Sequence, residues 1–272
     1  MSFEWGSSGW IEADGKRLEI STWGPPPGTA PTIVMLHEGL GCVALWRTFP
    51  EILANATGWG VCAYSRAGYG HSDRAALPRK ITYMTHEAAI VLPQVLSAIG
   101  FQRGVLLGHS DGATIAAEYL GEQEDMRVRG LILMAPHFFT EPEGLAEIDR
   151  ALTTYETTDM RARMGRYHAD PDHTFHGWRD AWLTPAFADW NVSDCIDYFR
   201  VPVLAIQGRQ DQFGSLAQIE EVAARSYAPV ELEVIEDCRH APHLEQADIV
   251  RDLISDYLAR LTRIEEAAGV PV

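Results

Sequence analysis

The hydrophobic pattern near the start of the chain predicts a β-hairpin. Apolar and polar residues alternate over residues 10–13 and 18–23, and Asp14-Gly15 lies between the two segments. Alternation with a period of two is typical of a strand with one buried face, and Asp-Gly is a favourable pair for a tight turn. We therefore expect the chain to open with two antiparallel strands.

Continuous apolar runs replace this alternation further along the chain. They cover residues 32–36, 61–64, 104–107, 131–135 and 203–207, and we expect a further strand at residues 232–235. Strands of a parallel sheet have this pattern because helices cover both of their faces. Between the runs lie segments with helical periodicity, at residues 43–57, 82–99, 111–121, 216–227 and 246–262. The alternation predicts an α/β fold with a mostly parallel central sheet flanked by helices.

Residues 137–200 interrupt the alternation. This segment is rich in Trp, Tyr, His and Met and contains no clear strand. A stretch of this length between two core strands should carry structure or function of its own. We predict a helical cap, inserted after the sixth strand, over the sheet edge at which open α/β sheets bind ligands. Residues 1–136 and 201–272 would then form the core and residues 137–200 the cap.

The composition and net charge of the chain argue against some classes of binding partner. The chain has 272 residues, 46% of them apolar, and 22 Lys and Arg against 38 Asp and Glu give a net charge of −16. This charge argues against nucleic acid and anionic membranes as partners. Four cysteines without tight spacing do not suggest a disulfide framework, and no signal pattern or long apolar run is present. We expect a cytoplasmic protein with a small-molecule substrate, and homo-oligomer formation is left open.

The strongest chemical signal is Gly108-His109-Ser110-Asp111-Gly112, between an apolar run and a helical segment. A G-x-S-x-G sequence between a strand and a helix forms a sharp turn that exposes the serine Oγ at the sheet edge. The helix begins at this point, so its positive end faces the reacting group. The alternative is a serine that only caps the helix after a glycine turn.

A serine hydroxyl needs a base, and the base needs a group that orients it. Asp211 follows the apolar run at 203–207, and His240 follows the expected strand at 232–235. The order Ser110, Asp211, His240 is the order expected for a nucleophile on such a turn. Because an aspartate after a strand is often only a turn former, other residues compete for these roles. The alternatives are His243 for the base and Asp194 or Asp237 for the acid.

Five segments together resemble the α/β-hydrolase fold superfamily, over about residues 10–262. They are L-H-E-G-L-G at 36–41, S-R-A-G-Y-G-H-S-D at 65–73, G-H-S-D-G at 108–112, G-R-Q-D at 208–211 and H-A-P-H-L-E at 240–245. The similarity is to small capped serine hydrolases, including esterases, lactonases and C–C hydrolases. It implies that Ser110 is the nucleophile, His240 the general base and then acid, and Asp211 the orienting carboxylate. It also implies that the main-chain N–H groups of Gly39 and Asp111 form the oxyanion hole.

The chain departs from the family pattern at Glu38, where most members have glycine. We expect the Glu38 carboxylate to turn outward and pair with Arg66 or Arg74, because a negative charge beside an oxyanion hole would oppose the reaction. The alternative is that Glu38 contacts the substrate or tunes the site. Arg66 should tie its loop to the sheet. The Asp111 carboxylate either stabilises the helix by interacting with the positive end of its dipole or recognises a cationic substrate.

No cofactor or metal is expected. His168, His173 and His176 lie near Asp170 and Asp172 in the predicted cap, but their spacing matches no zinc signature. The glycines at 68 and 70 lead into a loop rather than a helix, which argues against a dinucleotide fold. Cap aromatics should line a largely apolar pocket, and we expect Trp178 and Trp182, with Glu38, to contact the substrate.

The resemblance implies a hydrolase that cleaves a small carboxylic ester or lactone through an acyl-enzyme. Two alternatives would use the same residues: a C–C bond hydrolase of ring-fission products, and a cofactor-free perhydrolase or haloperoxidase. A ligand receptor on this fold is the alternative outside enzymes. Family members that cleave epoxides or haloalkanes have aspartate at the turn, so Ser110 argues against that chemistry.

Overall fold

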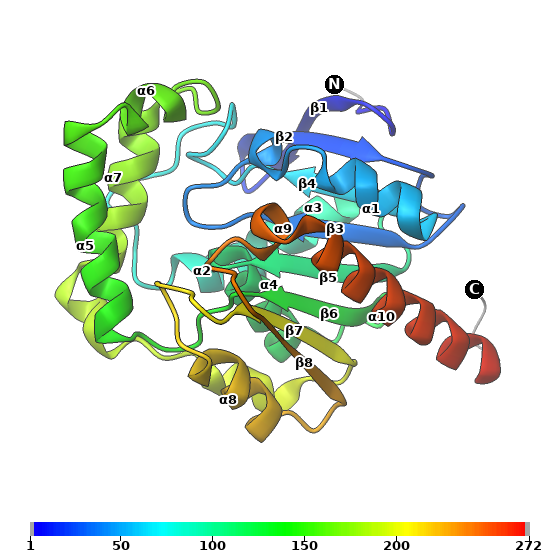
Figure 1. The fold of residues 1–272 in the computed structure, drawn as a ribbon. Coiled ribbons are helices and arrows are strands. Elements are labelled where there is room, and N and C mark those ends of the chain that lie inside the picture. The colour runs from blue at the N-terminus through cyan, green and yellow to red at the C-terminus, as the bar shows by residue number, and fades with distance from the viewer. Residues whose placement is uncertain (1–2, 270–272) are drawn as a thin grey trace.

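An eight-stranded sheet forms the centre of the computed structural model, which describes residues 3–269 (Figure 1). The strand order is β1-β2-β4-β3-β5-β6-β7-β8. The hairpin β1–β2 is antiparallel, β2 also pairs antiparallel with β4, and the later pairs are parallel. The strands are β1 Ser8–Ala13, β2 Lys16–Trp23, β3 Thr32–Leu36, β4 Gly60–Tyr64, β5 Gly104–His109, β6 Val128–Met134, β7 Val203–Gly208 and β8 Val230–Ile235. The predicted mixed, mostly parallel sheet is confirmed.

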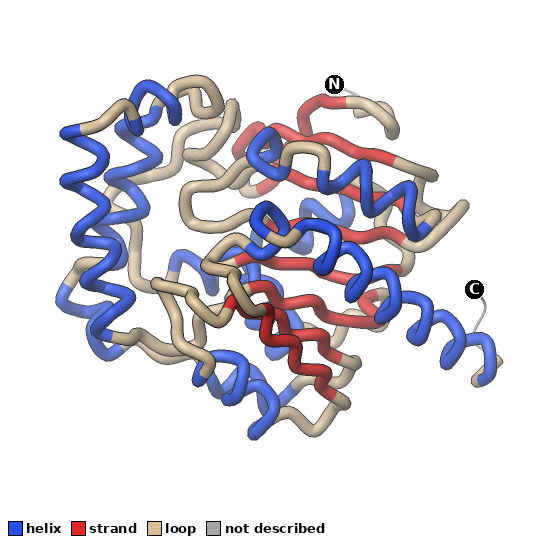
Figure 2. The backbone as a smooth tube through the Cα atoms, viewed as in Figure 1, coloured by secondary structure: helices blue, strands red, loops and turns tan. Residues whose placement is uncertain are grey.

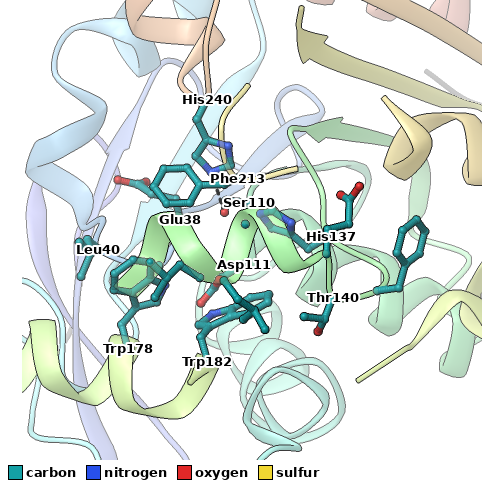
Figure 3. Close-up of a pocket in the computed structure, with 16 residues that line it drawn as sticks. Glu38, Leu40, Ser110, Asp111, His137, Thr140, Trp178, Trp182, Phe213 and His240 are labelled. Atoms are coloured by element: carbon teal, nitrogen blue, oxygen red, sulfur yellow. Dashed lines mark hydrogen bonds between the residues drawn. The ribbon is translucent and has the colours of Figure 1, made fainter. Parts of the chain in front are cut away.

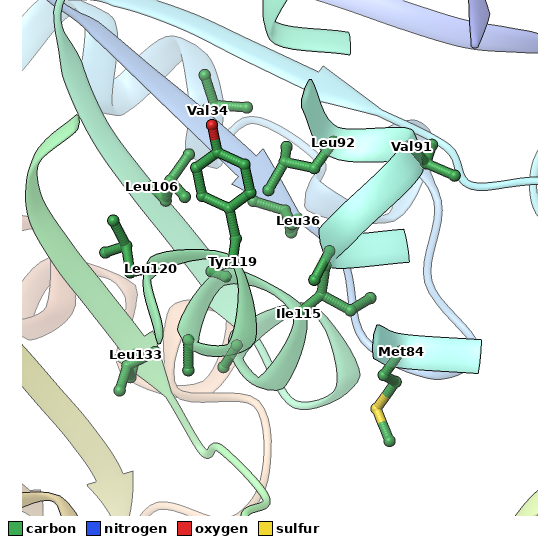
Figure 4. Close-up of a cluster of buried hydrophobic side chains, with 14 of the residues drawn as sticks. Val34, Leu36, Met84, Val91, Leu92, Leu106, Ile115, Tyr119, Leu120 and Leu133 are labelled. Carbon is green, nitrogen blue, oxygen red and sulfur yellow. The ribbon is translucent and has the colours of Figure 1, made fainter. Parts of the chain in front are cut away.

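Helices cover both faces of this sheet (Figure 2). Helices α1 (Phe49–Thr57) and α10 (Ala247–Ala267) pack on one face, and α3 (Leu92–Ala98), α4 (Asp111–Glu122) and α8 (Ala217–Arg225) on the other. Successive strand residues enter opposite clusters: Ile33 and Met35 pack with α1 and α10, whereas Val34 and Leu36 pack with α4 (Figure 4). This two-sided burial is the physical reason for the continuous apolar runs.

Two predicted helices are divided. Residues 82–99 form α2 (Tyr83–His86), a π-helical turn η2 (Glu87–Val91) and α3, in which Pro93 occupies the first turn. Proline has no N–H to donate, and a wider turn relieves the clash of its ring with the preceding carbonyl. Residues 43–57 likewise form the 3₁₀ turn η1 (Val43–Trp46) followed by α1, with Pro50 near its start.

The segment between β6 and β7 is helical, and its residues 142–182 lie to one side of the sheet (Figure 1, left). It contains α5 (Pro142–Thr157), α6 (Met160–Met164), α7 (Pro171–Trp182), η3 (Pro185–Asp189) and η4 (Ser193–Tyr198). The short helix α9 (Pro242–Glu245) follows β8. Residues 1 and 272, the outer bounds expected for the core, lie outside the described part of the chain. No helix within residues 3–269 has the length and apolar character needed to cross a bilayer.

Hydrogen bonds fix this helical segment to the core. His168 Nδ1 accepts from the N–H of Gly70 at 2.9 Å, and its Nε2 lies 3.0 Å from the carbonyl oxygen of Leu40. The Thr174 hydroxyl donates to the carbonyl of Gly68 at 2.7 Å. Both ring nitrogens of His168 are therefore used in positioning the segment.

Candidate active site

A strained turn places Ser110 between β5 and α4. Ser110 has φ 54° and ψ −121°, a conformation that side chains rarely adopt. Glycine is required on both sides of it. A Cβ at Gly108 would lie 2.3 Å from the carbonyl oxygen of Gly112, and a Cβ at Gly112 would lie 2.1 Å from that of Leu36. The turn can therefore form only with the glycine spacing of this sequence.

His240 lies between Ser110 and Asp211. Its Nε2 is 3.0 Å from Ser110 Oγ (Figure 3), and its Nδ1 is 2.9 Å from each carboxylate oxygen of Asp211. Because a carboxylate only accepts, Nδ1 carries the proton and Nε2 presents a lone pair to the serine hydroxyl. The geometry suits removal of the serine proton by the imidazole.

The surroundings of Asp211 favour its charged form. One oxygen accepts from the N–H groups of Phe213 at 2.9 Å and Gly214 at 3.4 Å, and the other from the Gln207 amide at 3.2 Å. Burial alone would raise the pKa of Asp211, but His240 and these hydrogen bonds hold its pKa below the usual range. The imidazole therefore faces an ionised carboxylate at neutral pH.

The alternatives for base and acid lie elsewhere. His243 is 3% exposed and packs between the rings of Trp46 and His109, where burial lowers its pKa to about 3. Asp194 pairs with Arg225 at 2.8 Å. Asp237 occupies an exposed turn with φ 51°.

Gly39 and Asp111 line the same cavity as Ser110. Gly39 follows β3, and the Trp178 indole lies on it so closely that a Cβ at position 39 would be 2.1 Å from Trp178 Nε1. Within residues 3–269, neither main-chain N–H donates a hydrogen bond to another residue. Unused N–H groups beside a nucleophile are what an oxyanion hole requires.

The expected outward salt bridge of Glu38 is wrong. Arg74 pairs with Asp170, and the guanidinium of Arg66 donates to the carbonyl oxygens of His37 and Glu38. Arg66 is 1% exposed, and because these carbonyls use its donors, it holds the loop as expected. The Glu38 carboxylate instead lines the cavity and lies 3.5 Å from His109 Nδ1.

His109 connects this carboxylate to the chain segment that carries His240. Its Nε2 is 2.7 Å from the carbonyl oxygen of His240, so Nε2 must donate. Nδ1 then meets the Glu38 carboxylate favourably only if the pair holds one further proton. Burial would raise the pKa of Glu38, but the adjacent His109 imidazole holds that pKa well below its usual range. The contact between the two side chains joins the loop after β3 to the His240 loop.

The Asp111 carboxylate is 1% exposed, and a hydroxyl and a guanidinium lie next to it. It accepts from the Tyr83 hydroxyl at 2.5 Å and lies 3.9 Å from Arg66. The Trp182 indole donates to the same hydroxyl at 3.1 Å. Burial raises the pKa of Asp111, and the Arg66 charge opposes that rise. No motif marks Tyr83, because α2 reaches the site only through the tertiary fold.

The cavity beside Ser110 has a volume of about 580 Å³. Glu38, Trp178 and Trp182 line it where the sequence placed them, with both indoles across the cavity from His240 (Figure 3). Sequence reasoning missed a further set of lining residues, namely Leu40, His137, Phe139, Thr140, Glu141, Leu145, Ile148 and Phe213. Among them, Leu40 lies in the segment 36–41 and Phe213 lies two residues after Asp211, so both had a sequence signal. Within residues 3–269, no three His, Cys, Asp or Glu side chains are arranged to hold a metal.

Comparison with known proteins agrees with this architecture. A sequence model of the family described as alpha/beta hydrolase fold matches residues 31–154. A non-heme chloroperoxidase of Streptomyces lividans is 24% identical over 263 residues, covering 84% of this chain and 91% of that protein. Epoxide hydrolase A of Mycobacterium tuberculosis is 32% identical over 106 residues, covering 39% of this chain and 31% of that protein.

Solved structures resemble nearly the whole chain. The enol-lactonase of Burkholderia xenovorans LB400 matches with a TM-score of 0.71 and 20% identity, covering 92% of this chain and all of the other, 100%. A structural likeness at this identity shows the fold. Together with the sequence matches it shows that the chain has the α/β-hydrolase fold, and the matched relatives support a hydrolase.

Proposed function

We propose that this protein is a serine hydrolase that cleaves a small carboxylic ester or lactone through an acyl-enzyme. The observation that carries the proposal is the hydrogen-bonded series Ser110, His240, Asp211, with the serine at 3.0 Å and the carboxylate at 2.9 Å from the imidazole. A histidine held between a carboxylate and a hydroxyl is the arrangement that makes serine nucleophilic.

In the first step His240 Nε2 accepts the Ser110 proton while Oγ bonds to the substrate carbonyl carbon. The carbonyl electrons move to oxygen, and the main-chain N–H groups of Gly39 and Asp111 stabilise that charge. Collapse of this intermediate breaks the bond to the alcohol oxygen, which takes the proton from His240. Water then repeats the sequence: it loses a proton to His240, attacks the acyl carbon and releases the acid with Ser110 restored.

The lining of the cavity supports a substrate that is apolar and carries no negative charge. Trp178, Trp182, Phe139, Leu145 and Ile148 supply apolar surface. The charged residues of the lining are Glu38, Asp111 and Glu141, and no Lys or Arg is among them. We propose that residues 137–200 act as a cap whose packing selects the acyl and alcohol groups.

The match to a non-heme chloroperoxidase favours a second candidate, a perhydrolase in which peroxide replaces water on the same acyl-enzyme. The match to an epoxide hydrolase carries less weight, because the turn here bears serine rather than aspartate. A C–C bond hydrolase would use the same residues, and no particular feature of the site favours it.

Turnover of p-nitrophenyl acetate and butyrate, together with labelling by a fluorophosphonate, tests the proposal. We expect labelling at Ser110 and ester turnover, both lost in Ser110→Ala while the circular dichroism spectrum is retained. Addition of peroxide distinguishes hydrolase from perhydrolase by the appearance of peracid. Labelling of Ser110 without turnover of any ester or lactone would support a receptor, and absence of labelling would refute a serine nucleophile.

A further inference from the structure

A second and larger cavity, of about 990 Å³, lies outside the active site. The hairpin β1–β2, the loop at residues 67–80 and the turns of α2 and η2 line it. Its lining shares no residue with that of the cavity beside Ser110. The reaction proposed above makes no use of it.

Positive charge gathers at this cavity in an otherwise acidic chain. The sequence contains two lysines, Lys16 and Lys80, and both line the cavity together with Arg79. Within residues 3–269, neither lysine side chain has an ion-pair or hydrogen-bond partner. The Asp14 carboxylate accepts a hydrogen bond from His86 Nε2 at 2.8 Å. The cavity lining holds three cations, Lys16, Arg79 and Lys80, against two carboxylates, Asp14 and Glu87, in a chain with a net charge of −16, whereas the active-site lining has no Lys or Arg.

Two buried polar groups at this cavity lack partners. Glu87 is 7% exposed and lines the cavity, and its Oε2 accepts no hydrogen bond within the described chain. Arg79 Nε is also buried and unpartnered, while its guanidinium packs over the rings of Tyr69 and Tyr83. Buried polar atoms are normally satisfied, so the free N–H of Arg79 calls for an acceptor, whereas the Glu87 oxygen calls for a donor. Glu87 also begins the π-helical turn, and such turns are frequent at functional sites.

Much of the remaining lining is apolar. Leu18 and Val91 are buried at the cavity, Pro78 and several alanines also line it, and Thr82, Tyr83 and His86 add polar groups. A bound molecule would therefore meet both hydrocarbon and cations. This combination suits an amphipathic anion rather than an inorganic ion.

We propose that this second cavity binds a small organic monocarboxylate with an apolar chain. Its carboxylate would lie among Lys16, Arg79 and Lys80, with Arg79 Nε as one donor, and its chain would lie on Leu18 and Val91. Binding does not depend on the reactivity of Ser110, so it can be tested in the Ser110→Ala protein.

Lysine labelling is a selective probe of this cavity, because the two lysines of the sequence both line it. Reductive ¹³C-methylation keeps their charge and should give two lysine signals beside that of the N-terminal amine. Lys16→Arg and Lys80→Arg assign the two signals. We expect hexanoate to shift both signals with one common saturation curve, while hexan-1-ol and hexylamine do not. Saturation by inorganic phosphate at equal concentration would refute the apolar part of the site, and no saturable shift with hexanoate would refute the proposal.

Calorimetry on the unmodified protein measures the contribution of the lysines. Lys16→Gln with Lys80→Gln should weaken hexanoate binding by about tenfold or more, since two charge contacts are lost. The control Arg166→Gln with Arg263→Gln removes the same charge from two exposed positions and should change affinity by less than about twofold. Equal weakening in both double variants would mean that net charge alone acts, and the site would be refuted. Loss of ester turnover leaves this result unchanged, so the two proposals fail independently.

Discussion

Replacement of Asp211 by asparagine tests the proposed mechanism most directly, because it changes charge and hydrogen bonding without changing volume. Each group around the Asp211 carboxylate is a donor: His240 Nδ1, the N–H groups of Phe213 and Gly214, and the amide of Gln207. Asparagine must point its own NH₂ at one of these donors. Where its NH₂ meets Nδ1, the imidazole protonates on Nε2 and can no longer accept the proton of the serine.

The size of the effect follows from the geometry. The carboxylate is 1% exposed at its side chain and lies 2.9 Å from Nδ1. With an effective dielectric constant of about 20, a charge pair at this distance interacts by ~6 kcal/mol when His240 becomes imidazolium. Loss of that interaction in the transition state predicts a decrease in kcat of about four orders of magnitude.

Initial rates with p-nitrophenyl butyrate at pH 8 measure this change. KM should change little, because Asp211 lies behind His240 rather than in the lining of the cavity. Thermal unfolding controls for loss of fold, and in a Ser110→Ala background the substitution should cause no further decrease. A decrease in kcat below about tenfold, in a folded protein, would refute the assigned role of Asp211.

Three further predictions concern the surroundings of the site. Glu38→Ala should lower kcat by about tenfold, because it removes the 3.5 Å contact to His109, for which we take ~1.4 kcal/mol, whereas Glu38→Gln should restore most of it by donating to the same imidazole; equal kcat in both would contradict this. Gly112→Ala should lower the free energy of unfolding by at least ~2 kcal/mol in urea titrations, since its Cβ would meet a main-chain oxygen at 2.1 Å, while Gly165→Ala, which meets nothing closer than 3.5 Å, should be tolerated. Burial lowers the pKa of His137 and of His243 to about 3, so both stay neutral in the fold while the unfolded chain protonates below about pH 6.5. Stability should therefore fall as the pH falls, by up to ~2 kcal/mol for each histidine at pH 5, and a Tm that is constant between pH 7 and 5 would contradict it.

The fold was predictable because its signals are local. A strand buried on both faces must be apolar throughout, and the runs at β3 and β7 show this directly. The π-helical turn before Pro93 was not predictable, since proline only forbids a regular bond and leaves open how the helix adapts.

The candidate site likewise has a part that was predictable from the sequence and a part that was not. Ser110, Asp211 and His240 follow strands whose ends meet at one edge of the sheet, so their convergence follows from topology. The orientation of Glu38 depends instead on competition for Arg66, which main-chain carbonyls win in the buried loop. Tyr83 and the cation cluster at Lys16 and Lys80 arise from residues far apart in the sequence, and no motif marks them.

Helix α5 begins in direct backbone contact with the loop that carries Asp211. A Cβ at Gly144 would lie 2.3 Å from the carbonyl oxygen of Phe213, and Phe213 in turn donates to Asp211 and packs its ring 4.8 Å from that of His240. A change in the position of α5 would therefore act on a residue that holds both the acid and the base. Substitutions along α5 should for this reason alter turnover even where they leave the shape of the cavity intact.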